Sequence, residues 1–211
     1  MSDQGFGDGR FASRSWAEVV ELIAAAPLAW IVSNGAMGFA ATPLPLRART
    51  DESGRLVRID GHFARANPQV EALRKDPQAL ILFMGVGGYI SPSWMQDRTQ
   101  APTWTYASVQ VRAEFELYED PERLRASIED LVTANEAGRP NAWAIDEMGP
   151  RYDRLSRGVV GFEARVLEVA AKFKLGQDEG DDTLSEILTG LAGEGEDELA
   201  QWISRFNSHR L

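Results

Sequence analysis

The segment from Thr103 to Tyr118, TWTYASVQVRAEFELY, alternates apolar and polar side chains over most of its length. This period of two is typical of a β-strand that buries one face and exposes the other. Other β-type runs are LAWIVS, GFAATPLPL, LVRIDGHF, QALILFMG and GVVGFEARVLEVAAKFKL. Because these runs succeed one another with few helices between them, we expect a mainly β (α+β) fold, an antiparallel barrel with peripheral helices.

Helix start signals divide these runs. Ser15 and Glu18 form a predicted capping box that opens a helix to about Ala26. Asn67 before Pro68 predicts the start of a second helix, and Asp120 before Pro121 the start of a third that runs to about Ala137. Two further short helices are expected near 183–191 and 196–206.

The charge is distributed unevenly. The net charge is -10, and nine carboxylates without a single Lys or Arg lie between Gly176 and Ser204. Removing them from the 32 acids leaves 23 acids against 22 bases, so the rest of the chain is nearly neutral. A phosphate-bearing ligand is therefore compatible with the body of the chain. A broad DNA-binding face has no support, because such a face needs clustered Lys and Arg.

Several chemistries are excluded by what the sequence lacks. There is no cysteine, and His62 and His209 are the two histidines, so neither a metal site nor a histidine triad is expected. The sequence has no apolar run of about 18 residues, which predicts no membrane span. Residues 1–14 read as a flexible leader without the features of a signal peptide, and the default location is the cytoplasm.

The stretch GHFARANPQ is a candidate phosphate site. A strand ends at His62, Arg65 follows, and a capped helix begins near Asn67. Guanidinium groups and free helix amides both donate hydrogen bonds to a phosphate dianion. The alternative is structural, with His62 a core residue, Arg65 a surface charge and Asn67 only a helix cap.

A polar loop after the fourth apolar run is flanked by SPSW and PTWTY. Large rings beside hydroxyl groups suit either the edge of a core or a site for a flat amphipathic ligand. These residues alone leave both interpretations open for Trp94, Trp104 and Tyr106.

Together, GHFARANPQ, YISPSW, PTWTY, GFE and KFKLGQ, in this order and spacing, resemble the PaiB family from about Trp16 to Leu191. The resemblance implies an FMN-binding split β-barrel that forms a homodimer, with each flavin in a groove between the subunits. It divides the chain into the leader, a flavin-binding domain at 15–175 and an acidic helical appendage at 176–211 packed on the barrel.

The resemblance also implies roles for individual residues. Arg65 would hold the phosphate with His62, Asn67 and Gln69 nearby, and the strand at Thr42 would offer backbone groups to the ring edge. Ser91 and Ser93 would bind the ring edge, and Trp94, Trp104 and Tyr106 would form walls. Lys174 and Gln177 would close the site.

The chain departs from the family pattern at Met95, Thr105, Gly176 and Asp178. If the position of Asp178 faces the flavin phosphate, its carboxylate would weaken cofactor binding.

Two functions follow. The first is a flavoprotein with a redox role, an FMN-dependent oxidoreductase of unnamed substrate and electron donor. The alternative is a negative transcriptional regulator that acts indirectly or through a partner, without catalysis.

Overall fold

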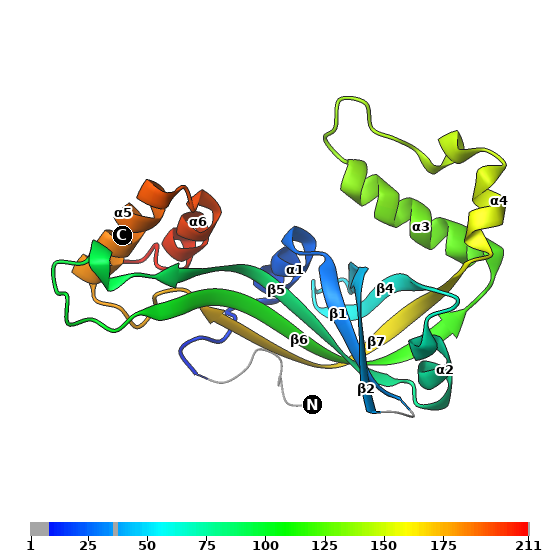
Figure 1. Ribbon diagram of the computed structural model, residues 1–211, viewed down its shortest axis with the longest axis horizontal. Helices are drawn as coiled ribbons and strands as arrows, with labels where there is room; N and C mark the ends of the chain where they lie inside the picture. Colours follow the sequence, from blue (N-terminus) through cyan, green and yellow to red (C-terminus); the bar gives the residue numbers. More distant parts are fainter. Residues whose placement is uncertain (1–8, 36–37, 211) are drawn as a thin grey trace.

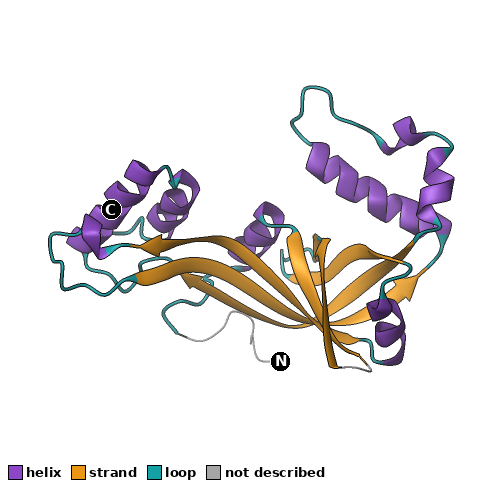
Figure 2. Ribbon diagram, in the orientation of Figure 1, coloured by secondary structure: helices purple, strands orange, loops and turns teal. Residues whose placement is uncertain are grey.

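The computed structural model describes residues 9–35 and 38–210, and its centre is one sheet of seven strands in the order β2-β1-β5-β6-β7-β4-β3 (Figures 1 and 2). The strands are β1 (Leu28–Gly35), β2 (Gly38–Pro45), β3 (Arg47–Thr50), β4 (Leu56–Ala64), β5 (Gln78–Ile90), β6 (Thr103–Tyr118) and β7 (Val159–Lys174). Every neighbouring pair is antiparallel. The predicted antiparallel, mainly β fold is confirmed.

The long strands β5, β6 and β7 form the body of the sheet. The alternation of β6 sets its pleat, since Ala107, Val109 and Val111 are fully buried while the residues between them face outward. Phe83 and Phe173 come from the flanking strands into the same buried layer. We call the opposite face of β1, β5, β6 and β7 the outer face.

Six α-helices surround the sheet in the part of the chain that the structure describes: α1 (Trp16–Ala25), α2 (Pro68–Lys75), α3 (Pro121–Glu136), α4 (Arg151–Ser156), α5 (Asp181–Glu194) and α6 (Asp197–Phe206). Short 3-10 turns occupy Pro92–Trp94 and Ile145–Met148. Five of the helices begin close to the predicted signals, while α4 and the short strand β3 were not predicted.

The start of α1 differs in detail from the predicted capping box. The Ser15 hydroxyl accepts a hydrogen bond from the Glu18 N–H at 3.3 Å, as expected. The Glu18 carboxylate, however, accepts from the N–H of Arg14 at 2.7 Å rather than from that of Ser15. The reciprocal half of the box is therefore shifted by one residue.

The acidic C-terminal helices pack against one end of the sheet (Figure 1). Trp202 and Phe206 of α6 stack on Phe173 of β7, with ring centroids 6.1 and 5.1 Å away. Near the other terminus, the N–H of Phe173 donates to the carbonyl of Phe11 at 2.7 Å, which ties part of the expected leader to β7. Residues 1–8 lie outside the described residues, and the three-part division of the chain stays a prediction.

Replacing Phe173 with alanine should destabilise the fold, because its ring is fully buried between β7 and α6. We expect a loss of about 3–5 kcal/mol in the free energy of unfolding, measured by urea titration. Val57→Ala, at a side chain 37% exposed on β4, is the matched control and should cost less than about 1 kcal/mol. Equal losses would contradict the packing described for α6.

Candidate functional site

The predicted site residues form two groups at opposite ends of the long strands. The α2 group consists of Thr42, His62, Arg65, Asn67 and Gln69, and the hairpin group of Ser91, Ser93, Trp94, Trp104, Tyr106, Lys174 and Gln177. Strand β5 starts just after α2 and ends just before Ser91, and its 13 residues span roughly 40 Å. Figure 1 shows α2 and the hairpin end of the sheet far apart.

Hydrogen bonds fix the amides of the α2 group. Asn67 caps α2, as predicted: its Oδ1 accepts from the Gln69 N–H at 2.9 Å. Its Nδ2 donates to the Thr42 hydroxyl at 2.9 Å, which joins β2 to the helix start. Thr42 lies in edge strand β2, whose pairing with β1 continues through Pro43.

Gln69 is almost completely buried, at 1% exposure. Its Nε2 lies within hydrogen-bonding distance of the carbonyls of Ile31 and Ala40 and of the Ser33 hydroxyl. Its Oε1 accepts no hydrogen bond from any residue that the structure describes. Gln69 thus joins α2 to β1 and β2 while its carbonyl oxygen stays unsatisfied.

His62 lies in β4 opposite Gly161 of β7. Burial lowers the pKa of its imidazole, which favours the neutral ring at neutral pH. A neutral imidazole can donate or accept one hydrogen bond at each nitrogen but adds no positive charge for a phosphate.

Arg65 is held by several acceptors. Its Nε and Nη2 donate to the carbonyls of Arg157 and Val159, at 2.8 and 3.2 Å. Its Nη1 lies 2.5 Å from a carboxylate oxygen of Glu119. The side chain still keeps 44% of its surface exposed, so solutes reach the guanidinium from outside.

In the hairpin group, the serines are arranged around the 3-10 turn. The hydroxyls of Ser91 and Ser93 lie 2.7 Å apart, and that of Ser91 also accepts from the Ser93 N–H. The following ring, Trp94, lies directly on Gly190 of α5, where an added Cβ would be 2.3 Å from the indole. Its Nε1 donates to Glu194 at 3.2 Å. These contacts favour the core-edge interpretation for Trp94.

Trp104 and Tyr106 lie on the outer face. Trp104 is 62% exposed and packs edge-on against Tyr89, with ring centroids 6.2 Å apart. Lys172 lies over the Tyr106 ring at 5.7 Å. Lys174 pairs with Tyr106 across the ladder, and its ammonium group donates to the hydroxyl of Thr103. These residues bring rings, hydroxyls and positive charge together on one open surface.

The side chain of Gln177 forms hydrogen bonds to the backbone at the end of β7. Its Oε1 accepts from the Leu175 N–H at 2.7 Å, and its Nε2 donates to the Phe173 carbonyl at 2.6 Å. Gly176 between them has φ +79°, a left-handed conformation that strains most other residues. This conformation gives a physical reason for glycine at one of the positions where the chain departs from the family pattern. Asp178 follows and is exposed.

Sequence reasoning missed an apolar strip on the outer face. Leu28 and Trp30 of β1 are 63% and 51% exposed, and Met84 of β5 is 65% exposed. Trp30 lies beside Leu82 in the ladder, so these side chains continue one another across two strands. Exposed apolar side chains that gather on one face are typical of an interaction surface. The sequence contained a signal for this strip, because β1 and β5 carry apolar residues at successive positions and so on both faces of the sheet.

Other features lie elsewhere. A cavity of about 760 Å³ opens between α1 and the β3–β4 turn, lined among others by Trp16, Glu21 and Thr50, and no predicted site residue lines it. Within 9–35 and 38–210, no cluster of three or more His, Asp or Glu suited to a metal ion is found. No helix among the same residues is long and apolar enough to cross a membrane.

The architecture is that of a flavin-type split barrel. Solved structures with a similar fold include the conserved hypothetical protein Rv2991 from Mycobacterium tuberculosis, with a TM-score of 0.59, 17% identity and coverage of 80% of this chain and 89% of that one. A second is the FAD and heme binding protein from Mycobacterium smegmatis, with a TM-score of 0.56, 17% identity and coverage of 82% and 78%. At these identities the likeness concerns the fold.

The sequence defines the family. The family described as "Putative FMN-binding domain" matches residues 7–168, and the chain belongs to it. The cofactor of this protein is FMN. A Bacillus subtilis (strain 168) relative, "Protease synthase and sporulation protein PAI 2", is 30% identical over 137 residues, which are 64% of this chain and 65% of the relative. The matched region thus spans slightly less than two thirds of that relative. The resemblance to the PaiB family is confirmed.

A second relative, the Emericella nidulans protein named "Uncharacterized protein AN0679", is 24% identical over 188 residues, which are 74% of this chain and 75% of the relative.

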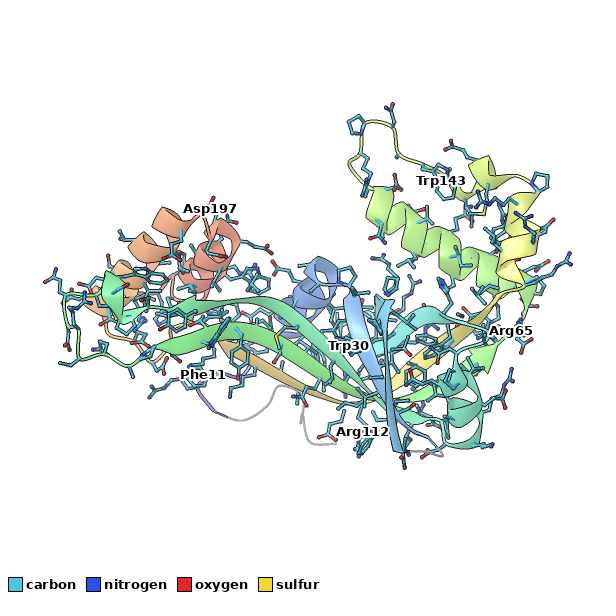
Figure 3. The ribbon with its side chains drawn as sticks, in the orientation of Figure 1. Phe11, Trp30, Arg65, Arg112, Trp143 and Asp197 are labelled. Atoms are coloured by element: carbon cyan, nitrogen blue, oxygen red, sulfur yellow. The ribbon has the colours of Figure 1, made fainter. Side chains whose placement is uncertain are left out.

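The donor chemistry of the chain fits FMN in two separate parts. A phosphate monoester needs cationic N–H donors, and the exposed guanidinium of Arg65 supplies them beside α2. The isoalloxazine needs apolar walls and polar edges. Trp104 and Tyr106 place rings on the outer face that can form walls, and Lys174, paired with Tyr106 in the ladder, can donate to an edge. The guanidinium of Arg65 and the exposed rings therefore lie at opposite ends of the sheet (Figures 1 and 3).

Gly190 provides a test of the contact that holds the hairpin. Gly190→Ala should destabilise the protein by about 1–3 kcal/mol in urea unfolding, because the new Cβ would overlap the Trp94 indole. Gly193→Ala, in the same helix with open space around it, should instead stabilise by about 0.5–1 kcal/mol. If Gly190→Ala stabilised the protein as Gly193→Ala does, Trp94 would be free to move away from α5.

Proposed function

We propose that the protein is a homodimeric FMN-dependent redox protein in which each flavin lies between the α2 group of one subunit and the outer face of the other. The observation that carries this proposal is the separation of the two groups along roughly 40 Å of strand in one chain. A flavin is too short to contact both ends of the same subunit.

Two-fold symmetry brings the groups together. A dimer formed through the outer face, with its axis crossing the middle of the long strands, places the α2 end of one subunit beside the hairpin end of the other. The exposed side chains of Leu28, Trp30 and Met84 supply the apolar centre that a stable dimer buries. The dimer therefore accounts for both the exposed strip and the divided site.

The phosphate assignment is tested by comparing FMN with riboflavin, which lacks the phosphate. Arg65→Ala should weaken FMN binding roughly tenfold, because a hydrogen bond to a charged group contributes about 1.5–3 kcal/mol and this one is half exposed. Riboflavin affinity should change little. Titrations followed by flavin fluorescence measure both ligands, and equal losses for the two would contradict the role of Arg65.

The dimer is tested with a charge placed in the apolar strip. Trp30→Glu should convert the protein to monomers in light scattering and weaken FMN binding strongly, since a glutamate at the interface must lose its hydration. Leu155→Glu, at a side chain 45% exposed on α4, is the control and should remain dimeric. A monomeric wild type that binds FMN at full affinity would rule out the shared site.

The flavin would supply the redox chemistry, and the protein would bind and orient it. Reduction of the bound flavin by NADH or NADPH would separate this role from a regulatory protein without catalysis. Direct binding of DNA through α3 is not favoured, because its basic residues are already paired: Arg123 with Glu116 and Glu163, and Arg125 with Asp146. Any regulation is therefore proposed to be indirect. The lack of cysteine agrees with a cytoplasmic location.

A further inference from the structure

Two arginines from different elements converge on one carboxylate beside α2. Glu119 directly follows β6, Arg65 lies in the loop between β4 and α2, and Arg74 lies in the last turn of α2. The two carboxylate oxygens of Glu119 are each taken by one arginine, Oε2 by Arg65 and Oε1 by Arg74, at 2.5 Å in both cases. Figure 3 labels Arg65 at this end of the sheet.

The cluster is open to solutes. The side chains of Arg65, Arg74 and Glu119 keep 44%, 43% and 45% of their surface exposed. The hydrogen bond from Arg65 is the main reason that the pKa of Glu119 is lowered, so its carboxylate is an anion at neutral pH. A carboxylate between two guanidinium groups presents the same pattern of charge and acceptors as two oxygens of a phosphate.

We propose that Glu119 is an internal anion that competes with the FMN phosphate for Arg65, and that Arg74 is a second phosphate-binding residue. This proposal rests on the assignment of Arg65 to the phosphate in the proposed function. When FMN binds, its phosphate takes the place of the Glu119 carboxylate between the two guanidinium groups. Rotation of the Glu119 side chain toward solvent is sufficient, because its carboxylate is already half exposed.

A competing role and a supporting role for Glu119 predict opposite changes in FMN affinity when its carboxylate is removed. If Glu119 only positioned the arginines, its removal would disorder them and weaken FMN. If it competes with the phosphate, its removal frees donors that are already in place. The sign of the change in FMN affinity therefore distinguishes the two.

The experiment measures FMN and riboflavin affinity for the full chain and its variants by fluorescence titration. Glu119→Gln should bind FMN about three- to fivefold more tightly, the range of an exposed ion pair, and riboflavin unchanged. When the FMN concentration is set to the same multiple of its dissociation constant in both proteins, inorganic phosphate should displace FMN from this variant at an about three- to fivefold lower concentration. Arg74→Ala should weaken FMN binding about three- to fivefold. In the double variant Arg74→Ala with Glu119→Gln, less than half of the gain in FMN affinity caused by Glu119→Gln should remain.

Glu21→Gln is the matched control, because Glu21 forms an equally exposed pair with Arg205 on α1 and α6. Glu21→Gln removes the same charge and should leave the affinities for FMN and riboflavin unchanged. An equal gain in FMN affinity in this control would show that the effect comes from net charge, and it would overturn the proposal. Unchanged or weaker FMN binding by Glu119→Gln, with Arg65→Ala still selective for FMN, overturns this inference alone. Equal losses of FMN and riboflavin in Arg65→Ala overturn the proposed function as well.

Discussion

The structure depends on the pairing of β6 along both of its edges. One edge pairs with β5 from Gln78 to Ile90, and the other pairs with β7 from Gly161 to Lys174. These two ladders fix the register of the three longest strands, and the register decides which side chains enter the core. Phe83 and Phe173 are buried because of it, while Met84 and Lys174 are turned to the outer face. A slip of one residue would exchange the two sets.

The same ladders explain why the candidate site is divided. They extend the sheet far beyond the width of one flavin, so the GHFARANPQ and SPSW motifs lie at opposite ends of the sheet (Figure 1). The α2 end is rich in fixed polar contacts, with Asn67 and Gln69 joining three elements. The hairpin end is held by α5, which contacts Trp94, and by α6, which stacks on Phe173 on the buried face of the sheet. The dimer that we propose would make one site of the two ends.

Ion pairs give the α2 end a further property. Arg65 joins this end to the start of β7 through backbone carbonyls and meets Glu119 with its remaining edge. Because the guanidinium groups are already oriented by neighbouring acceptors, a phosphate would find them ordered before it binds. This ordering of the guanidinium groups would lower the entropic cost of phosphate binding, and competition from the Glu119 carboxylate would offset part of that advantage.

The sequence by itself determined most of the strands, most helix starts and the family. Alternation in β6 and capping residues such as Ser15, Asn67 and Asp120 act over a few neighbours, so their effects can be read locally. Sequence reasoning also singled out Asn67 as a cap and Arg65 as a charged residue beside α2. It did not give the contact of Trp94 with Gly190, or the approach of Glu119 and Arg74 to Arg65. These contacts join residues far apart in the chain, and only the register of β6 with its neighbours and the packing of the helices on the sheet decided them.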